Sequence, residues 1–278
     1  MWLVSTVMND FLTRLEKVIP HGEELILSWL GQAGFLIKTA KGKLIVIDPC
    51  LSDYTYRINQ KEHGQMFRRV APPLCDPCQI NADMLFISHE HADHCEIDSL
   101  PGLLINPESL CYTNSASIKE AASNNIPTDK FHEIKRGGII NFDEFKFSAV
   151  DCDHGTQSPE AMGFIFDFGF VSVYYSGDTS YNKERLADVI TRGVDVALLP
   201  INGAFGNLNA QDAARYAGDL GAKLCIPHHF WTFPGHEGPL GNPKDAIEFF
   251  PKYAPGCILR LCTPGELILI GRNGTCNL

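Results

Sequence analysis

The stretch His89-Glu90-His91-Ala92-Asp93-His94 decides what can be predicted for this chain, because six positions hold three imidazoles and two carboxylates. It directly follows Met84-Leu85-Phe86-Ile87, an apolar run typical of a buried strand. Imidazole binds a divalent metal through one ring nitrogen, and a carboxylate serves the same ion or a neighbouring one. The pattern H-x-H-x-D-H offers more donors than one closed site uses. It therefore predicts two divalent metal ions.

Length and composition predict one large domain behind a short extension. The chain has 278 residues, of which 45% are hydrophobic and 20% charged, enough to bury a sizeable core. No low-complexity linker divides it, so we expect an N-terminal helical extension at 1–22 and a single domain at 23–278. The formal net charge of −10 argues against nucleic acid as a partner.

The N-terminal residues and the cysteines indicate a cytoplasmic protein. Residues 1–20 are interrupted by charged side chains and lack the apolar core of a signal peptide. No run approaches the roughly 18 apolar residues of a membrane span, so no membrane partner is expected. Ten cysteines in such a chain are interpreted as reduced thiols. Whether copies associate into a homo-oligomer is left open.

Four cysteines leave alternatives open. Cys75-Asp76-Pro77-Cys78 is a single C-x-x-C, which we weigh as half of a structural zinc site with Cys50 as third ligand, against plain surface or buried thiols. Cys95 adjoins the histidine motif and is a ligand, an oxidation-sensitive neighbour or a packing residue.

Periodicity and turn residues predict an α/β chain. The expected strands are 25–30, 34–38, 43–48, 84–88, 103–105, 145–150, 162–168, 170–176, 194–201, 222–227, 257–262 and 266–270. The expected helices are 1–20, a short one at 109–124, 182–192 with Asn182 as its cap, 211–220 with Asn209 as its cap, and 244–253. Residues 51–80 are expected to be irregular, with one or two helical turns. A meander followed by βα units, repeated once, predicts two facing sheets with helices outside, a four-layer α/β/β/α sandwich.

Metal donors also follow four other predicted strands. Asp48 ends the strand expected at 43–48, and Asp178 follows the strand expected at 170–176. The strand at 145–150 is followed by Asp151, Asp153 and His154, and the strand at 222–227 is followed by His228 and His229. Donors placed repeatedly at strand ends predict convergence on one rim of the sheets. Asp151 and Asp153 are interpreted as loop residues.

From about residue 24 to the C-terminus the chain resembles the metallo-β-lactamase superfamily, whose signature is the H-x-H-x-D-H loop with a later His, Asp and His. The resemblance implies that fold and the following site. The first metal would be held by His89, His91 and His154. The second would be held by Asp93, His94 and His229, with Asp178 bridging the two. Asp48 would stand behind a ligand imidazole and orient it.

Several shorter stretches resemble the branch containing bacterial L-ascorbate-6-phosphate lactonase. They are Trp29-Leu30-Gly31-Gln32-Ala33-Gly34, His63-Gly64-Gln65-Met66, Asp76-Pro77, Ser176-Gly177-Asp178 and Ile226-Pro227-His228-His229. This resemblance implies a lactonase acting on a small phosphorylated sugar-acid lactone with manganese or zinc. The flavo-diiron oxygen reductases of the same fold differ, because they carry Glu where His91 stands.

The implied reaction is hydrolysis by a metal-bridging hydroxide, since two cations lower the pKa of a shared water toward ~7. Asp93 is the expected catalytic residue, positioning the nucleophile and passing on its proton. In a chain this acidic, a small anionic substrate needs a cationic partner. The candidates, interpreted otherwise as a solvated charged loop, are Arg57, Lys61, His63, Arg68 and Arg69.

Two other functions remain open. A metal-dependent phosphodiesterase is the first, including the branch that hydrolyses N-acyl phospholipids and shares the Trp-Leu-Gly opening. A non-catalytic sensor of a metabolite or metal is the second, and it would retain affinity whether or not Asp93 is intact.

Overall fold

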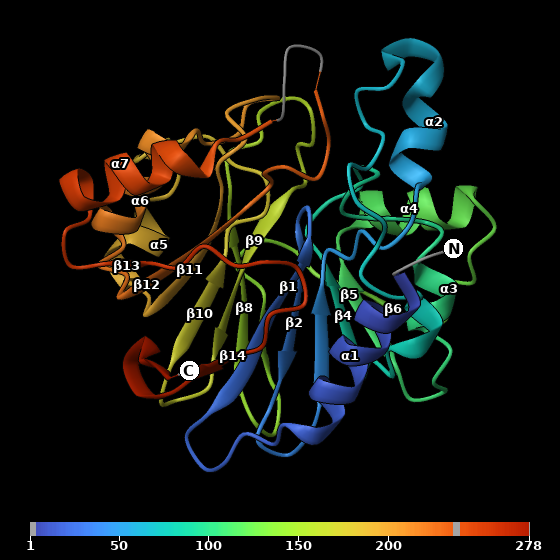
Figure 1. The fold of residues 1–278 in the computed structure, drawn as a ribbon, viewed down its shortest axis with the longest axis horizontal. Coiled ribbons are helices and arrows are strands. Elements are labelled where there is room, and N and C mark those ends of the chain that lie inside the picture. Colours follow the sequence, from blue (N-terminus) through green and yellow to red (C-terminus); the bar gives the residue numbers. More distant parts are fainter. Residues whose placement is uncertain (1–3, 236–239, 278) are drawn as a thin grey trace.

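Two β-sheets face each other in the computed structural model, which describes residues 4–235 and 240–277 (Figure 1). The first sheet has the strand order β15 (Cys276–Asn277), β14 (Ile268–Ile270), β1 (Leu25–Gly31), β2 (Gly34–Lys38), β3 (Leu44–Ile47), β4 (Met84–Ile87), β5 (Leu110–Thr113) and β6 (Phe131–Glu133). The second has the order β13 (Ile258–Leu259), β12 (Leu224–His228), β11 (Val196–Pro200), β10 (Ser172–Tyr175), β9 (Met162–Asp167), β8 (Lys146–Asp151) and β7 (Ile139–Asn141).

Helices cover the outer face of each sheet. The first sheet is flanked by α1 (Val4–Lys17), α3 (Leu100–Leu103) and α4 (Ser115–Ser123), while α2 (Tyr54–His63) projects beyond its end (Figure 1). The second sheet is flanked by α5 (Ala187–Arg192), α6 (Ala210–Asp219) and α7 (Pro243–Tyr253). No helix in the described ranges is long and apolar enough to cross a membrane.

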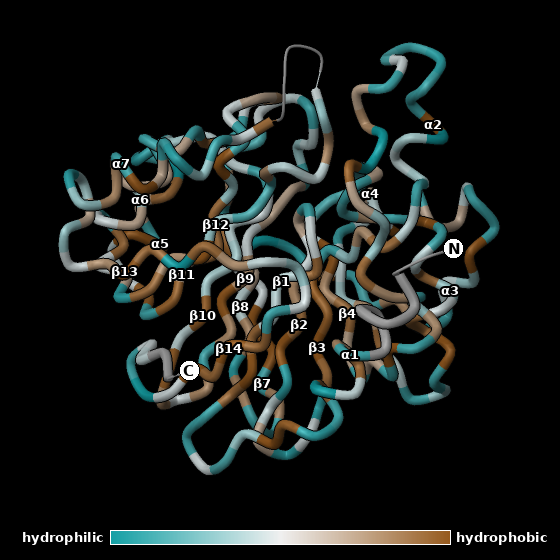
Figure 2. The backbone as a smooth tube through the Cα atoms, viewed as in Figure 1, coloured by the Kyte–Doolittle hydropathy of each residue, from teal (hydrophilic) through white to brown (hydrophobic). Residues whose placement is uncertain are grey.

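Side chains of the first sheet alternate between two cores, as the two-residue period of a strand requires. Along β2, Phe35 and Ile37 join the core between the sheets, whereas Leu36 joins the core under α1 and α3. In β4, Phe86 joins the core between the sheets and Leu85 joins the core under the helices. Figure 2 shows the resulting hydrophobic strands at the centre and hydrophilic loops around them. The predicted four-layer α/β/β/α sandwich is confirmed.

Three predicted elements differ in the structure. The segment 109–124 was expected to be one short helix, but it holds strand β5 before α4 begins at Ser115. Residues 103–105 were expected to form a strand, but α3 ends at Leu103 and Ile105 is exposed. Pro101 at the start of α3 favours a helical turn and cannot donate to a strand ladder. The helix expected at 182–192 begins only at Ala187, after a turn at 183–186. The Asn182 side chain caps that turn by accepting a hydrogen bond from the Arg185 backbone N–H.

Other elements lacked a clear sequence signal. The excursion at 51–80 contains α2, a full helix of 10 residues rather than one or two turns. Strands β6 and β7 have 3 residues each, too few to show alternation, and each lies at an edge of its sheet. The Asn209 cap of α6 is confirmed, since its side chain accepts from the Asp212 backbone N–H.

The strand ends that carry metal donors meet at one rim of the sandwich. Strands β3 and β4 run parallel, so Asp48 and His89 leave the first sheet on the same side. In the second sheet β10, β11 and β12 are parallel, and β8 shares their direction because β9 is antiparallel to both β8 and β10. His154, Asp178 and His229 therefore leave the second sheet along one edge.

Candidate metal centre

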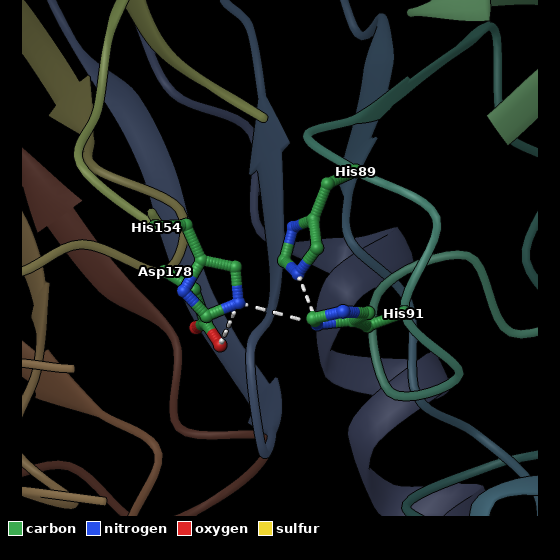
Figure 3. Close-up of side chains that lie close together, drawn as sticks. All are labelled: His89, His91, His154 and Asp178. Atoms are coloured by element: carbon green, nitrogen blue, oxygen red, sulfur yellow. Dashed lines mark hydrogen bonds and ion pairs between the residues drawn. The ribbon is translucent and has the colours of Figure 1, made fainter. Parts of the chain in front are cut away.

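Three histidines and one aspartate form the first group of donors (Figure 3). Nε2 of His89 lies 3.0 Å from Nδ1 of His91, and Nε2 of His154 lies 3.2 Å from that same Nδ1. Oδ2 of Asp178 lies 3.8 Å from Nε2 of His154. The loop after β4 supplies two of these side chains, and segments after β8 and β10 supply the others. The four donor atoms lie within 4.8 Å of one another, so they can surround one cation.

A second group adjoins the first and consists of Asp93, His94 and His229. Oδ2 of Asp93 lies 3.9 Å from Nε2 of His94 and 3.7 Å from Nε2 of His229. Oδ1 of Asp178 lies 3.2 and 3.1 Å from the same two nitrogens. Asp178 thus turns one oxygen toward each group, which is the position of a bridging carboxylate.

The donor atoms fit a cation better than they fit one another. Oδ1 of Asp178 is shielded from solvent and makes no hydrogen bond. Nδ1 of His94 donates to Asp48, so its Nε2 is the nitrogen that faces Oδ1 of Asp178, at 3.2 Å. Buried donor atoms gathered this closely are costly unless a proton or a metal cation lies among them. The residues present therefore fit a divalent metal.

Asp48 holds His94 from behind. It is fully buried, and its backbone has φ +40°, in the left-handed region that non-glycine residues rarely adopt. Oδ2 accepts hydrogen bonds from Nδ1 of His94 and from the Tyr175 hydroxyl, both at 2.6 Å, and from the Ser88 hydroxyl. Oδ1 accepts the Ser88 backbone N–H at 2.7 Å. These contacts fix the ring of His94 with Nε2 toward the centre.

Charge and burial shift the pKa values of these groups in opposite directions. Burial lowers the pKa of His89 well below its usual range, and the neighbouring His94 lowers it further. Burial also acts to lower the pKa of His94, but the carboxylates of Asp178, Asp93 and Asp48 outweigh it and hold that pKa well above the usual range. For Asp178, burial disfavours the anion, yet His229 and His94 hold its pKa well below the usual range.

His229, rather than His228, faces the centre. The ring of His228 is fully buried and stacks on Tyr175, with centroids 5.3 Å apart. Burial lowers its pKa well below the usual range. The other two donors beside His154 are also placed elsewhere: Asp151 and Asp153 form ion pairs with Arg185.

Gln32 belongs to the centre, although no role was predicted for it. Its Nε2 lies 2.9 Å from Oδ2 of Asp93 and 2.8 Å from Nδ1 of His229. Its carbonyl accepts the His229 backbone N–H at 3.0 Å, and its own N–H donates to the Thr232 hydroxyl. Gln32 has φ +49° and His229 φ +59°, so two strained backbones are tied together here. The only signal was its place within Trp29-Leu30-Gly31-Gln32-Ala33-Gly34.

A cavity of about 340 Å³ opens over the donors. Its described lining is Gln32, Thr55, Ile58, Asn59, Phe67, Glu90, His91, Ala92, Asp93, Glu120, Gln157, Asp178, Asn202, Phe205, Asn207, His229, Phe233 and Leu240. A larger, apolar cavity of about 880 Å³ lies behind residues 29–31 and 230–232 and contains none of the donors. We take the smaller one as the site because it contains His91, Asp93, Asp178 and His229.

The structure does not bring the predicted substrate-binding cations to this cavity. Arg57 pairs with Asp98 at 2.7 Å, Arg68 donates to Gln65, and Lys61 is exposed. The ring of His63 packs on Phe67, with centroids 5.5 Å apart, and Arg69 donates to the Cys50 carbonyl and lines the larger cavity. Helical spacing explains the outcome for α2: Thr55, Ile58 and Asn59 share the face toward the cavity, so Arg57 and Lys61 lie off it.

The cysteines stand apart from the metal donors. Within the described residues, the donor groups able to hold a metal contain no cysteine. Cys75 is buried, whereas Cys78 is exposed, and Cys50 contacts Glu96 and Arg69. Cys95 is buried with its Sγ 3.8 Å from the Ser117 carbonyl, the position of a packing residue.

Comparison with the sequences of known proteins also indicates a metal-dependent hydrolase. Residues 26–229 match the family model described as beta-lactamase superfamily domain. A UPF0173 metal-dependent hydrolase of Methanoculleus marisnigri is 30% identical over 257 residues, covering 88% of this chain and 96% of the relative. A second UPF0173 metal-dependent hydrolase, from Carboxydothermus hydrogenoformans, is 26% identical, and the match covers 88% of this chain and 99% of that relative.

Solved structures share the fold at lower identity. A metallo hydrolase of the archaeon Ignicoccus hospitalis superposes with a TM-score of 0.65 at 20% identity, covering 89% of this chain and 98% of that one. The lactonase branch that the short stretches resemble is not among these relatives, which carry the broader name. The chain therefore belongs to the metallo-β-lactamase superfamily, as a metal-dependent hydrolase of the UPF0173 family.

Proposed function

We propose that this hydrolase holds two divalent metal ions, manganese or zinc, and cleaves the C–O bond of a small lactone or related ester. The observation that carries the proposal is the placement of Asp178, whose two oxygens face two different groups of three donors. His89, His91 and His154 would hold one ion, and Asp93, His94 and His229 the other. Histidine-rich sites suit zinc, while the two carboxylates also suit manganese.

When bound, two such ions would lower the pKa of a shared water and polarise the scissile carbonyl oxygen. The protein's own part falls largely to Asp93, whose side chain is 19% exposed and lines the cavity. Gln32 holds Oδ2 of Asp93 at 2.9 Å and so fixes its orientation. In the proposed reaction Asp93 positions the attacking water, accepts its proton, and returns that proton to the alkoxide oxygen as the C–O bond breaks.

The cavity lining favours a lactone over a phosphodiester. A phosphoryl group carries charge on several oxygens, which enzymes neutralise with arginine or lysine side chains as well as metals. Apart from histidine, the described lining of this cavity contains no basic side chain. A phosphorylated sugar acid, which the lactonase resemblance implies, would need a cation from outside this lining. A cytoplasmic location and association into oligomers stay predictions.

The test is a panel of lactones, carboxylic esters, phosphodiesters and thioesters given to the metal-loaded protein and to its Asp93→Asn variant. We expect lactone or ester turnover that falls by about a hundredfold or more in Asp93→Asn, the usual range for a lost general acid or base. Asp143→Asn is the matched control, because that exposed carboxylate pairs only with Lys41 at the surface.

Two results would contradict the proposal. Turnover of phosphodiesters without turnover of lactones or esters would favour the phosphodiesterase. Metal or metabolite binding with no turnover in either protein would favour the sensor.

A further inference from the structure

Three phenyl rings gather at the cavity over the donors. The ring of Phe67 lies 6.1 Å from that of Phe205 and 5.7 Å from that of Phe233, centroid to centroid. All three line the cavity, and Ile58 on α2 joins them with 49% of its surface exposed. Aromatic side chains arranged around a concave site are the usual means of binding apolar parts of a ligand. These apolar side chains, called the wall below together with the other residues beside them, line the same cavity as the polar metal donors.

Phe205 is held there at a conformational cost. Its backbone has φ +55°, and 44% of its surface is exposed. A bulky side chain in the left-handed region is an outlier that costs conformational free energy. Burial accounts for the position only in part, because 44% of the residue remains exposed. A ligand that covers the ring would use it.

Two asparagines of the same wall have polar atoms without partners. Oδ1 of Asn202 and both side-chain polar atoms of Asn207 are shielded from solvent and make no hydrogen bond within the described structure. Buried amide groups are nearly always paired, since leaving a buried polar atom without a hydrogen bond costs its full desolvation free energy. Both side chains line the cavity, so a bound molecule can supply the missing donors and acceptors.

The charges on the wall disfavour an anionic substituent. Glu90 and Glu120 line the cavity, and the described lining holds no lysine or arginine. The nearby cations are engaged elsewhere: Arg57 pairs with Asp98, and Arg69 lines the other cavity. An anionic group placed away from the metals would therefore meet carboxylates of like charge.

We propose that the site selects uncharged lactones or esters that carry an aromatic or alkyl substituent. The substituent packs against Phe67 and Phe205, while Asn202 and Asn207 hydrogen-bond to polar atoms of the substrate. A cavity of about 340 Å³ accommodates a small molecule of this kind. The inference rests on the proposed function and narrows its substrate class.

The test compares two γ-butyrolactones with the metal-loaded protein, one bearing a phenyl group and the other a phosphoryloxymethyl group at the same ring carbon. We expect kcat/KM to favour the phenyl lactone by a factor of about ten or more, which corresponds to about 1.4 kcal/mol. Phe205→Ala, at a position where 44% of the residue is exposed, should lower kcat/KM for the phenyl lactone by about tenfold, mainly through KM. It should leave the phosphorylated lactone within about twofold.

Matched variants make the result specific. Ile105→Ala removes an exposed apolar side chain that does not line the cavity and should change kcat/KM for neither substrate. Phe67→Ala should reproduce the selective loss of Phe205→Ala. A preference for the phosphorylated lactone, or an equal loss for both substrates in Phe205→Ala, overturns the inference and leaves the proposed function standing. Turnover of neither lactone, with esters also inert, contradicts the proposed function itself.

Discussion

Oδ2 of Asp48 lies 2.6 Å from Nδ1 of His94, although the two residues are 46 positions apart and both side chains are fully buried. The contact joins the end of β3 to the histidine loop after β4. Because a proton on Nδ1 is held by Asp48, Nε2 of His94 is left free to bind a metal. The orientation of one donor is therefore set by a residue that does not itself face the cavity.

Asp48→Asn should weaken metal binding by about ten- to a hundredfold, the usual effect of losing the partner behind a ligand histidine. An amide can present its NH₂ to Nδ1, which favours the tautomer that cannot bind through Nε2. Titration with a chelator of known affinity measures the change. Asp143→Asn should bind metal like the wild type. Equal affinity in Asp48→Asn would contradict the role given to Asp48.

Gln32→Leu should selectively weaken the group formed by Asp93, His94 and His229. The substitution removes the contacts of Gln32 with Oδ2 of Asp93 and Nδ1 of His229, each worth about 1 kcal/mol or more. We expect about a tenfold loss of affinity for one ion and little change for the other, measured by calorimetric titration with two-site analysis. Gln65→Leu, which loses only exposed contacts with Tyr56 and Arg68, is the control. An equal loss at both sites would contradict this assignment.

The metal-free protein should lose stability as pH rises above about 6.5. The folded chain holds the pKa of His94 well above its usual range, so the folded state keeps a proton that the unfolded chain releases. That stabilisation is complete below the unfolded pKa and is lost as pH rises through the folded one. His89 and His228 have pKa values below their usual range, so in the folded state they lose their protons at a lower pH than in the unfolded chain. Their contribution makes stability rise with pH, but only below about pH 6.5.

The metal-loaded protein should show the opposite slope between pH 6.5 and 8. A metal must displace the proton from His94, so its binding strengthens as pH rises. Thermal unfolding of chelator-treated and metal-loaded protein across this range compares the two slopes. Parallel slopes would show that His94 does not exchange a proton for a metal.

Phe11→Ala should destabilise the protein by about 3–5 kcal/mol, the cost of deleting a buried phenyl ring. Phe11 is fully buried in α1, and a methyl group on Gly265 would come within 3.3 Å of its ring. Lys38 ties the end of the same helix to the sheet by donating to the Leu15 and Val18 carbonyls. Urea denaturation measures the change. Ile19→Ala, at an exposed position, should change stability by no more than about 0.5 kcal/mol.

The parts of the fold that sequence predicts well are those with a clear period or an uncommon cluster. The strand at 84–88 and the donors around His89 are visible because apolar runs and clustered histidines are rarely accidental. Residues such as His154 and Asp178 were found only because each follows a strand and a family pattern names them. The structure brings all seven predicted donors together, whereas the metals they hold stay a prediction.

The cavity wall could not be predicted because its side chains come from segments without a period. Sequence indicated 51–80 as the source of substrate contacts, and this segment does line the cavity. It does so through Thr55, Ile58, Asn59 and Phe67, whereas Arg57, Arg68 and Arg69 do not line the cavity. The face of α2 that lies toward the cavity could not be predicted, because the sequence pattern of 51–80 did not indicate a helix there. Gln32 was missed for a related reason, since an amide becomes recognisable only when its two partners, 61 and 197 residues away, are in place.

The central claim is that two metal ions lie on either side of Asp178. Crystals of the protein loaded with zinc or manganese, measured at the absorption edge of that metal, test it most directly. The account predicts two anomalous peaks per chain, one among His89, His91 and His154 and the other among Asp93, His94 and His229, with one Asp178 oxygen toward each. A single peak in fully loaded crystals, or peaks away from Asp178, would contradict it.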